Sequence, residues 1–283
     1  MGPVRPAPDL GDGSGTGSGA MEFVPDGHGG VIVMLDGQPQ SHVDPADPGN
    51  LVFEYVLHMG LVLDALPGGP LAVTHVGGAG LTLARYVQHT RPGSPQIVLE
   101  PDTALTEAVR RELPLPRGHR IRVRPVDGRT GVAALRDGSA DVVVLDAYAG
   151  GRMPAELSSV EFLGEVRRVL REDGLLLANV SDEPSREHLR RWYAALSRVF
   201  PETAAIALAE VWKRRRFGNY VVLGSRRPID TAALTRPVAA CPFPSSLRGG
   251  PELGRLLGSA RPYTDADTAT SPQPPPREGW RLR

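Results

Sequence analysis

Short apolar segments alternate with helical segments between residues 71 and 224, and this alternation limits the possible folds more than any other feature of the chain. It predicts an α/β domain with a doubly wound, mostly parallel sheet, because connections between parallel strands are usually helical. Such sheets bind ligands at the carboxyl ends of their strands. The predicted strands lie at residues 71–76, 96–100, 120–126, 141–146, 174–180 and 219–224, and the predicted helices at 81–89, 103–113 and 185–200.

A further helix is expected to begin at a capping box, formed by Ser158 and Glu161, and to run to about residue 170. Upstream, the apolar run 31–35 is followed by Asp36-Gly37, a hairpin signal, with residues 38–43 as the returning strand. A helix is predicted over residues 51–66, where apolar residues recur at helical spacing.

Four regions follow from this pattern. Residues 1–20 are rich in Gly, Pro and Ser, with little to bury, and are expected to be a disordered tail. Residues 21–66 form a small N-terminal β-hairpin subdomain with its linking helix, and residues 67–227 form the main domain. Residues 228–283 are a Pro-rich C-terminal extension that either wraps the domain or hangs free, and periodicity does not decide between the two.

Composition argues against several classes of function. Lys+Arg and Asp+Glu total 32 each, so no overall field favours nucleic acid or an anionic membrane. The single cysteine, Cys241, excludes a disulfide within the chain and a cysteine-rich zinc site. The sequence has no apolar run of about 20 residues and no signal peptide, which favours the cytoplasm. No metal-ligand spacing, P-loop or G-x-S-x-G motif occurs.

Glycines and carboxylates follow four of the predicted strands, where such a sheet binds its ligands. A glycine turn permits close approach of a ligand, an acidic residue about 20 positions later suits a ribose diol, and a carboxylate after a buried strand is costly unless it has a task. Together these positions predict a nucleoside site, although each also has a plain structural reading as a turn or a helix cap. They are Gly77, Gly78 and Gly80, then Glu100, then Asp127-Gly128, then Asp146.

Residues 22–226 resemble the spermidine synthase group of aminopropyltransferases. The similarity rests on several short stretches rather than on any single motif. These are VMLDGQPQ (33–40), FEY (53–55), HVGGAG (75–80), LEPD (99–102), Val126-Asp127-Gly128, VVVLDAYAG (142–150) and VLREDGLLLAN (169–179). The resemblance implies the Rossmann-like fold of class I S-adenosylmethionine-dependent methyltransferases.

The resemblance also implies roles for the matched positions. On the nucleoside side, Gln40 would reach the nucleoside from the N-terminal hairpin, the glycine turn would lie under the sulfonium, Glu100 would hold the ribose, and Asp127 and Gly128 would hold the adenine. The co-substrate would be decarboxylated S-adenosylmethionine or S-adenosylmethionine, without a metal.

On the acceptor side, Asp146 would be the base that takes a proton from an attacking amine. Tyr55 would line the substrate channel, and Tyr148 is expected to contact the substrate. The partner is then a small-molecule amine or another small acceptor, with no nucleic acid or membrane, and the family implies a possible homo-oligomer.

Three departures from the family pattern affect the acceptor side. Gly80, Leu57 in the Val56-Leu57 pair, and Ala149 stand where the family has carboxylates, and a diamine needs carboxylates to offset the desolvation of its ammonium groups. Poor binding of putrescine is therefore expected. Aminopropyl transfer and methyl transfer to a small molecule both stay open, as does a non-catalytic nucleoside-binding homologue. The basic run 213–216 raises nucleic-acid binding, but a solvated turn explains it better.

Overall fold

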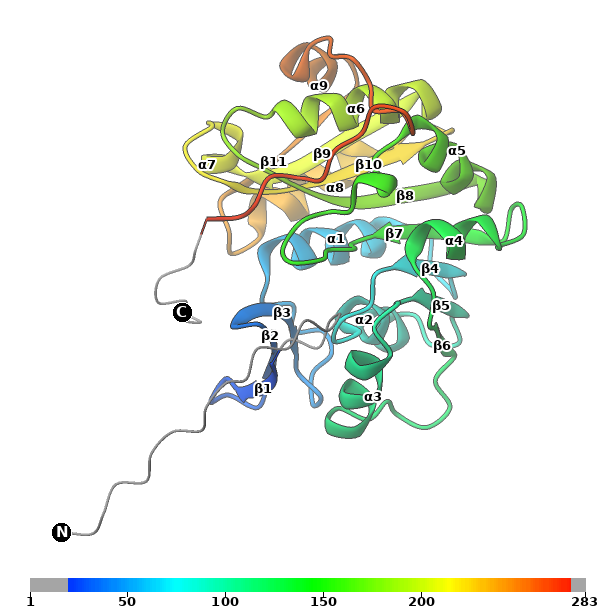
Figure 1. Ribbon diagram of the computed structural model, residues 1–283, viewed down its shortest axis with the longest axis vertical. Coiled ribbons are helices and arrows are strands. Elements are labelled where there is room, and N and C mark those ends of the chain that lie inside the picture. Colours follow the sequence, from blue (N-terminus) through cyan, green and yellow to red (C-terminus); the bar gives the residue numbers. More distant parts are fainter. Residues whose placement is uncertain (1–19, 276–283) are drawn as a thin grey trace, which may run out of the picture.

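The computed structural model describes residues 20–275 and contains two sheets (Figure 1). The large sheet has eight strands in the order β11-β9-β10-β8-β7-β4-β5-β6, and a small sheet has the order β1-β2-β3. The strands are β1 Met21–Pro25, β2 Val31–Leu35, β3 Gln38–Val43, β4 Val73–Val76, β5 Gln96–Leu99, β6 Ile121–Arg124, β7 Ala140–Leu145, β8 Leu170–Asp182, β9 Glu202–Leu208, β10 Gly218–Ser225 and β11 Ser245–Gly249.

Helices cover both faces of the large sheet (Figure 1). One apolar cluster joins α4, α5, α6 and α9 to one face, and a second joins α1, α2 and α8 to the other. The helices are α1 Glu54–Ala65, α2 Thr82–Thr90, α3 Thr103–Glu112, α4 Gly128–Ala133, α5 Val160–Val169, α6 Glu187–Val199, α7 Ala209–Trp212, α8 Thr231–Ala240 and α9 Gly250–Leu257, with a 3-10 turn at Ala155–Leu157.

The doubly wound, mostly parallel sheet is confirmed. Strands β4 to β8 pair in parallel, whereas β8, β10, β9 and β11 pair in an antiparallel manner at one side. The chain proceeds from β4 to β5 and β6 on one side and then returns to place β7 on the other side of β4. The strand order therefore reverses at β4, which makes the carboxyl ends of β4, β5 and β7 the expected ligand position.

The small N-terminal subdomain contains the predicted hairpin and one strand more. Asp36 and Gly37 connect β2 to β3 with positive φ values of 51° and 70°, as a tight Asp-Gly hairpin requires. Strand β1 was not predicted, because MEFVP has neither clear alternation nor a turn signal after it. The inner face of this sheet packs through Val33 and Val43 onto α2 and α3.

The C-terminal extension wraps the domain, which settles the two options that the sequence left open. Residues 231–240 form α8, and residues 245–249 form β11, the edge strand beside β9. The strand at 218–225 is consequently not the last one, and β9 was missed altogether, because its Ala-rich sequence has a weak strand signal. The predicted tail at residues 1–20 lies, apart from Ala20, outside the described residues.

Two local details complete the comparison with the predicted elements. The helix α5 is capped by Ser159, whose hydroxyl accepts from the Phe162 amide at 3.1 Å, so the capping box predicted at Ser158 and Glu161 was wrong by one residue. Ser158 instead directs its hydroxyl to the sulfur of Met153. Among residues 20–275, no helix has the length and apolar character that crossing a membrane demands.

Candidate active site

The strand register brings three predicted site residues to one level of the sheet. Val76 is paired with Leu99 on one side and with Leu145 on the other, so the next residues, Gly77, Glu100 and Asp146, follow three adjacent strand ends. These positions are distant in sequence. Parallel pairing alone aligns them, and it does so at the point where the strand order reverses.

Gly77 is the first residue of the turn after β4, and its backbone conformation and surroundings leave no room for a side chain. Its φ is +93°, and a Cβ atom there would lie 2.2 Å from the carbonyl oxygen of Asp146. Gly78 is also tightly placed, because a Cβ atom would lie 2.8 Å from a methyl carbon of Val98. The turn thus carries its backbone close to the end of β7, and a side chain at either position would push the two strand ends apart.

The Glu100 carboxylate is held against this turn. One oxygen accepts from the amide of Gly78 at 2.9 Å and from that of Ala79 at 3.3 Å, and the other accepts from the amide of Asp102 at 3.0 Å. Asp102, not Glu100, caps α3 by accepting from Leu105 at 2.8 Å. Glu100 is therefore free of the capping role, and its partly exposed carboxylate keeps acceptor capacity for a ribose diol.

Gly80 is buried beneath the small N-terminal sheet. Its amide donates to the Ser41 hydroxyl at 3.0 Å, and a Cβ atom would lie 2.8 Å from the Cβ of Ser41 and 3.0 Å from a methyl carbon of Val43. Residues of β3 thus occupy the space that the side chain of an aspartate at position 80 would need. Gln40, next to Ser41, is partly exposed and donates only to the carbonyl of Gln38, at 3.4 Å.

Asp127 and Gly128 lie at the turn between β6 and α4. Asp127 is exposed and caps α4 by accepting from the Thr130 amide at 2.8 Å, and this bond holds the pKa of its carboxyl below the usual value. Gly128 packs tightly, since a Cβ atom would lie 2.4 Å from a methyl carbon of Val76. The structural reading of Asp127 as a turn residue is therefore correct, and a second role toward adenine stays a prediction.

Asp146 is the strongest chemical feature of this edge. It is partly buried, and this burial raises the pKa of its carboxyl from 3.8 to about 6, against the opposing effect of hydrogen bonds from Asn179 and Tyr55. The Asn179 side-chain amide donates to Asp146 at 3.0 Å. A carboxylate with a pKa near neutrality, held by two donors, is suited to accept a proton.

Asn179 was not predicted as a site residue, although it ends the apolar run of β8. It is 3% exposed, and its side-chain carbonyl oxygen has no hydrogen-bond partner within residues 20–275. The sequence signal that could have identified Asn179 is a polar residue at the end of an otherwise apolar, buried strand segment. The oxygen is a ready acceptor for an N–H group of a ligand.

Tyr148 has a structural position beside this pair. Its hydroxyl donates to the backbone carbonyl of Asn179 at 3.0 Å and accepts from the backbone amide of Ser181 at 3.0 Å. Burial raises the pKa of the hydroxyl above its usual value, so the phenol stays neutral. Tyr148 therefore secures the end of β8, and contact with a substrate stays a prediction.

The loop after β7 is tied down by the C-terminal segment. The Gln273 side chain donates to the carbonyl of Gly150 at 3.0 Å, and the Arg152 guanidinium donates to the carbonyl of Ser271 at 2.7 Å. Farther along the same segment, Asp265 pairs with Arg129, two residues after Asp127. The glycine pair at 150–151 thus packs against a C-terminal segment, residues 259–275, which is called the strap below.

This chain has Leu57, Gly80 and Ala149 at the positions where the family has carboxylates. Val56 and Leu57 belong to the apolar face of α1, and Ala149 forms an isolated bridge with Arg152. Within residues 20–275, no group of three or more His, Cys, Asp or Glu residues is arranged to hold a metal ion.

Curated proteins similar to this chain include polyamine aminopropyltransferases. No protein-family model matches the chain. The polyamine aminopropyltransferase of Vibrio vulnificus is 28% identical over 144 residues, which are 50% of this chain and 48% of that protein. The chain thus matches about half the length of this curated relative.

Solved structures extend the likeness over most of the chain. A probable spermidine synthase from Corynebacterium glutamicum is 27% identical, with a TM-score of 0.82, and the alignment covers 90% of this chain and 97% of that one. Human methyltransferase-like protein 13, with 21% identity, a TM-score of 0.55 and coverage of 75% and 96%, shares the fold. The motifs, the fold and these likenesses together show that the chain is similar to the spermidine synthases and has the fold of class I methyltransferases.

Proposed function

We propose that the protein transfers an aminopropyl group from an S-adenosyl sulfonium donor to an amine, with Asp146 as the general base. One observation carries the proposal: a carboxylate with a pKa near 6 lies beside the glycine turn and Glu100, at the reversal of strand order. The similarity to polyamine aminopropyltransferases supports the same reaction class.

The residues present fit an adenosine group at this edge. The Gly77-Gly78 turn has no room for side chains, and Glu100 keeps acceptor capacity toward a ribose diol. Asp127 is exposed at the third strand end, where a carboxylate accepts from an adenine amino group. The donor, when bound, supplies a carbon that its positively charged sulfur makes electrophilic.

The acceptor amine attacks that carbon, so that a C–N bond forms while the C–S bond breaks and its electron pair goes to sulfur. The new secondary ammonium then releases a proton, which Asp146 accepts. The side-chain carbonyl oxygen of Asn179 has no hydrogen-bond partner within residues 20–275, so it can accept from an N–H of the amine beside the base. Most of the acceleration would come from positioning, since the displacement needs no covalent intermediate.

The acceptor is proposed to be an amine without a second ammonium deep in the site. A buried ammonium needs a carboxylate partner, and Gly80, Leu57 and Ala149 supply none. Gly80 in particular is covered by β3, so no side chain could reach the donor from that position. Putrescine and longer polyamines are therefore expected to be poor acceptors.

Calorimetric titration tests the donor. The full chain is titrated with decarboxylated S-adenosylmethionine, S-adenosylmethionine and methylthioadenosine, and Glu100→Ala is compared with Glu107→Ala, an exposed position on α3. We expect the decarboxylated donor to bind most tightly and Glu100→Ala alone to weaken binding by about tenfold or more, because a charge-assisted hydrogen bond is lost.

The outcomes separate the competing functions. Tighter binding of S-adenosylmethionine would replace aminopropyl transfer by methyl transfer. Binding of the decarboxylated donor without turnover, tested with a panel of monoamines and diamines and followed by the release of methylthioadenosine, would leave a non-catalytic nucleoside-binding protein. If no nucleoside binds, the assignment of this edge as a donor site is wrong.

A further inference from the structure

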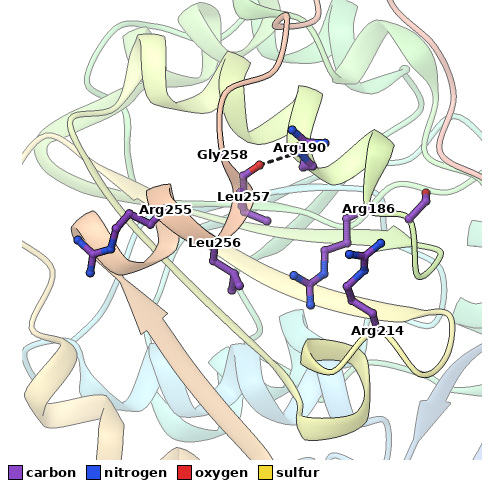
Figure 2. Close-up of a pocket in the computed structure, with 8 residues that line it drawn as sticks. Arg186, Arg190, Arg214, Arg255, Leu256, Leu257 and Gly258 are labelled. Atoms are coloured by element: carbon purple, nitrogen blue, oxygen red, sulfur yellow. Dashed lines mark hydrogen bonds between the residues drawn. The ribbon is translucent and has the colours of Figure 1, made fainter.

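A cavity lined by four arginine residues lies on the face of the sheet covered by α6 and α9. It has a volume of about 230 Å³ and is bounded by Arg186 and Arg190 at the start of α6, Arg214 after α7, and Arg255 near the end of α9. Ser185 and the last turn of α9 complete the lining, and none of the lining residues is acidic. Figure 2 shows Arg186 and Arg214 extending side by side on one side of the cavity, opposite Leu256.

Arg186 forms the buried base of this cavity. The residue is 5% exposed, and its guanidinium donates to the hydroxyl of Tyr220 at 3.0 Å and to the backbone carbonyls of Val211 and Trp212. It also lies over the rings of Trp212 and Tyr220, at 5.6 and 5.9 Å from their centroids. Every one of these partners is neutral, so the positive charge is oriented without being offset.

The other three arginines are also without a carboxylate. Arg190 donates to the carbonyl of Leu257 at 2.7 Å (Figure 2) and to that of Ser259 at 3.1 Å. Arg214 donates to the carbonyl of Pro184 at 2.7 Å. The ion pairs found within residues 20–275 include none of the four.

The neighbouring basic residues behave differently. Lys213 and Arg215 pair with Glu210, at 3.9 and 3.1 Å. The basic run 213–216 is thus divided, with two of its charges offset locally and Arg214 turned to the cavity.

Nearby acidic residues have other partners. Asp182 accepts from the Leu189 amide at 2.6 Å, and Glu183 accepts from the Ser185 hydroxyl at 2.8 Å. Arg186 and Arg214 lie side by side without a carboxylate (Figure 2), so their like charges repel one another, and an anion placed beside them would remove that cost. Guanidinium groups match the geometry of phosphate oxygens, to which they donate in pairs.

We propose that this cavity binds a phosphate group, either as a free inorganic anion or as the phosphoryl end of a larger ligand. The proposal is independent of the reaction at Asp146. Consecutive residues of a strand point to opposite faces, so Asn179, which contacts Asp146, and Val180 face apart. Tyr220 is paired with Val180 and holds Arg186, which puts the cavity on the other face from Asn179.

Pyrophosphate is the probe, because it carries no adenosine and cannot report on the donor site. The full chain is titrated calorimetrically at constant ionic strength, together with Arg214→Gln, an exposed position, and Arg216→Gln as the matched control. We expect Arg214→Gln to weaken binding by about tenfold or more, and Arg216→Gln to change it by less than about twofold. Unchanged thermal unfolding would show that the variants are folded.

Two results would overturn the proposal: no binding of pyrophosphate by the wild-type chain, or equal weakening by Arg216→Gln, which would mean diffuse attraction rather than a site. Parallel titrations of Glu100→Ala with pyrophosphate and adenosine triphosphate identify the source of the phosphate. Equal affinity indicates a free anion, and tighter binding of the nucleotide indicates a phosphorylated ligand. Retained pyrophosphate binding in Glu100→Ala also separates this proposal from failure of the donor site.

Discussion

Replacing Asp146 by Asn should stabilise the protein at neutral pH while removing its proton acceptor. Asn keeps the shape of the side chain, can still accept from Asn179 and never ionises. Burial raises the pKa of Asp146 from 3.8 to about 6, so the folded state disfavours the charged form. At about 1.4 kcal/mol per pKa unit, the folded wild type loses about 3 kcal/mol of stability when this carboxyl ionises.

The raised pKa of Asp146 decides at which pH the two proteins should differ in stability. A carboxyl whose pKa is raised on folding imposes no cost below its unfolded pKa, near 4, and the full cost above its folded pKa, near 6. Urea unfolding should therefore show Asp146→Asn to be more stable than wild type by about 3 kcal/mol at about pH 7.5, and nearly equal to it below about pH 4.

The matched control is Asp137→Asn. Asp137 is 80% exposed in its pair with Arg168, so its replacement should change stability by less than about 1 kcal/mol. A gain for Asp146→Asn that is the same at both pH values, or a loss at neutral pH, would refute the reasoning about burial.

Three further predictions concern neighbouring positions. Tyr55→Phe removes a hydrogen bond that lowers the pKa of Asp146, so the acidic limb of the kcat/KM profile should move upward from about pH 6, and an unmoved limb would separate this bond from catalysis. Gly80→Asp should lower the unfolding free energy by about 1–3 kcal/mol without improving putrescine turnover, because β3 occupies the space, whereas Gly68→Asp, with open space around it, should have little effect in the same urea titration. Asp265→Ala should cost about 1 kcal/mol or less and speed proteolysis within residues 259–275, and an unchanged cleavage rate would mean that the pair with Arg129 does not secure the strap.

The small N-terminal sheet fills the space beside Gly80. Ser41 and Val43 pack onto Gly80, and the Thr82 hydroxyl donates to the carbonyl of His42 at 2.8 Å. These contacts join β3 to the start of α2 and leave little volume for an aspartate in the turn.

Local pattern was sufficient to predict the fold class and the residues that follow the ends of β4, β5 and β7. Apolar runs alternating with helical spacing specify parallel strands, and parallel pairing brings strand ends to one edge whatever the loops contain. Gly77, Glu100 and Asp146 could thus be predicted to meet, because each immediately follows a strand whose register is set by burial.

Other features depended on contacts between segments that are distant in the chain, and no local pattern encodes those. Asn179 donates to Asp146 from the adjacent strand, Ser41 covers Gly80, and β11 pairs with β9 at an edge that the local sequence pattern did not predict. The arginine cavity is the extreme case, since it draws on α6, the turn after α7 and α9. The sequence by itself determined which chemistry each strand end carries, and only tertiary packing decided which side chains surround it, because burial and charge compensation are properties of neighbours in space.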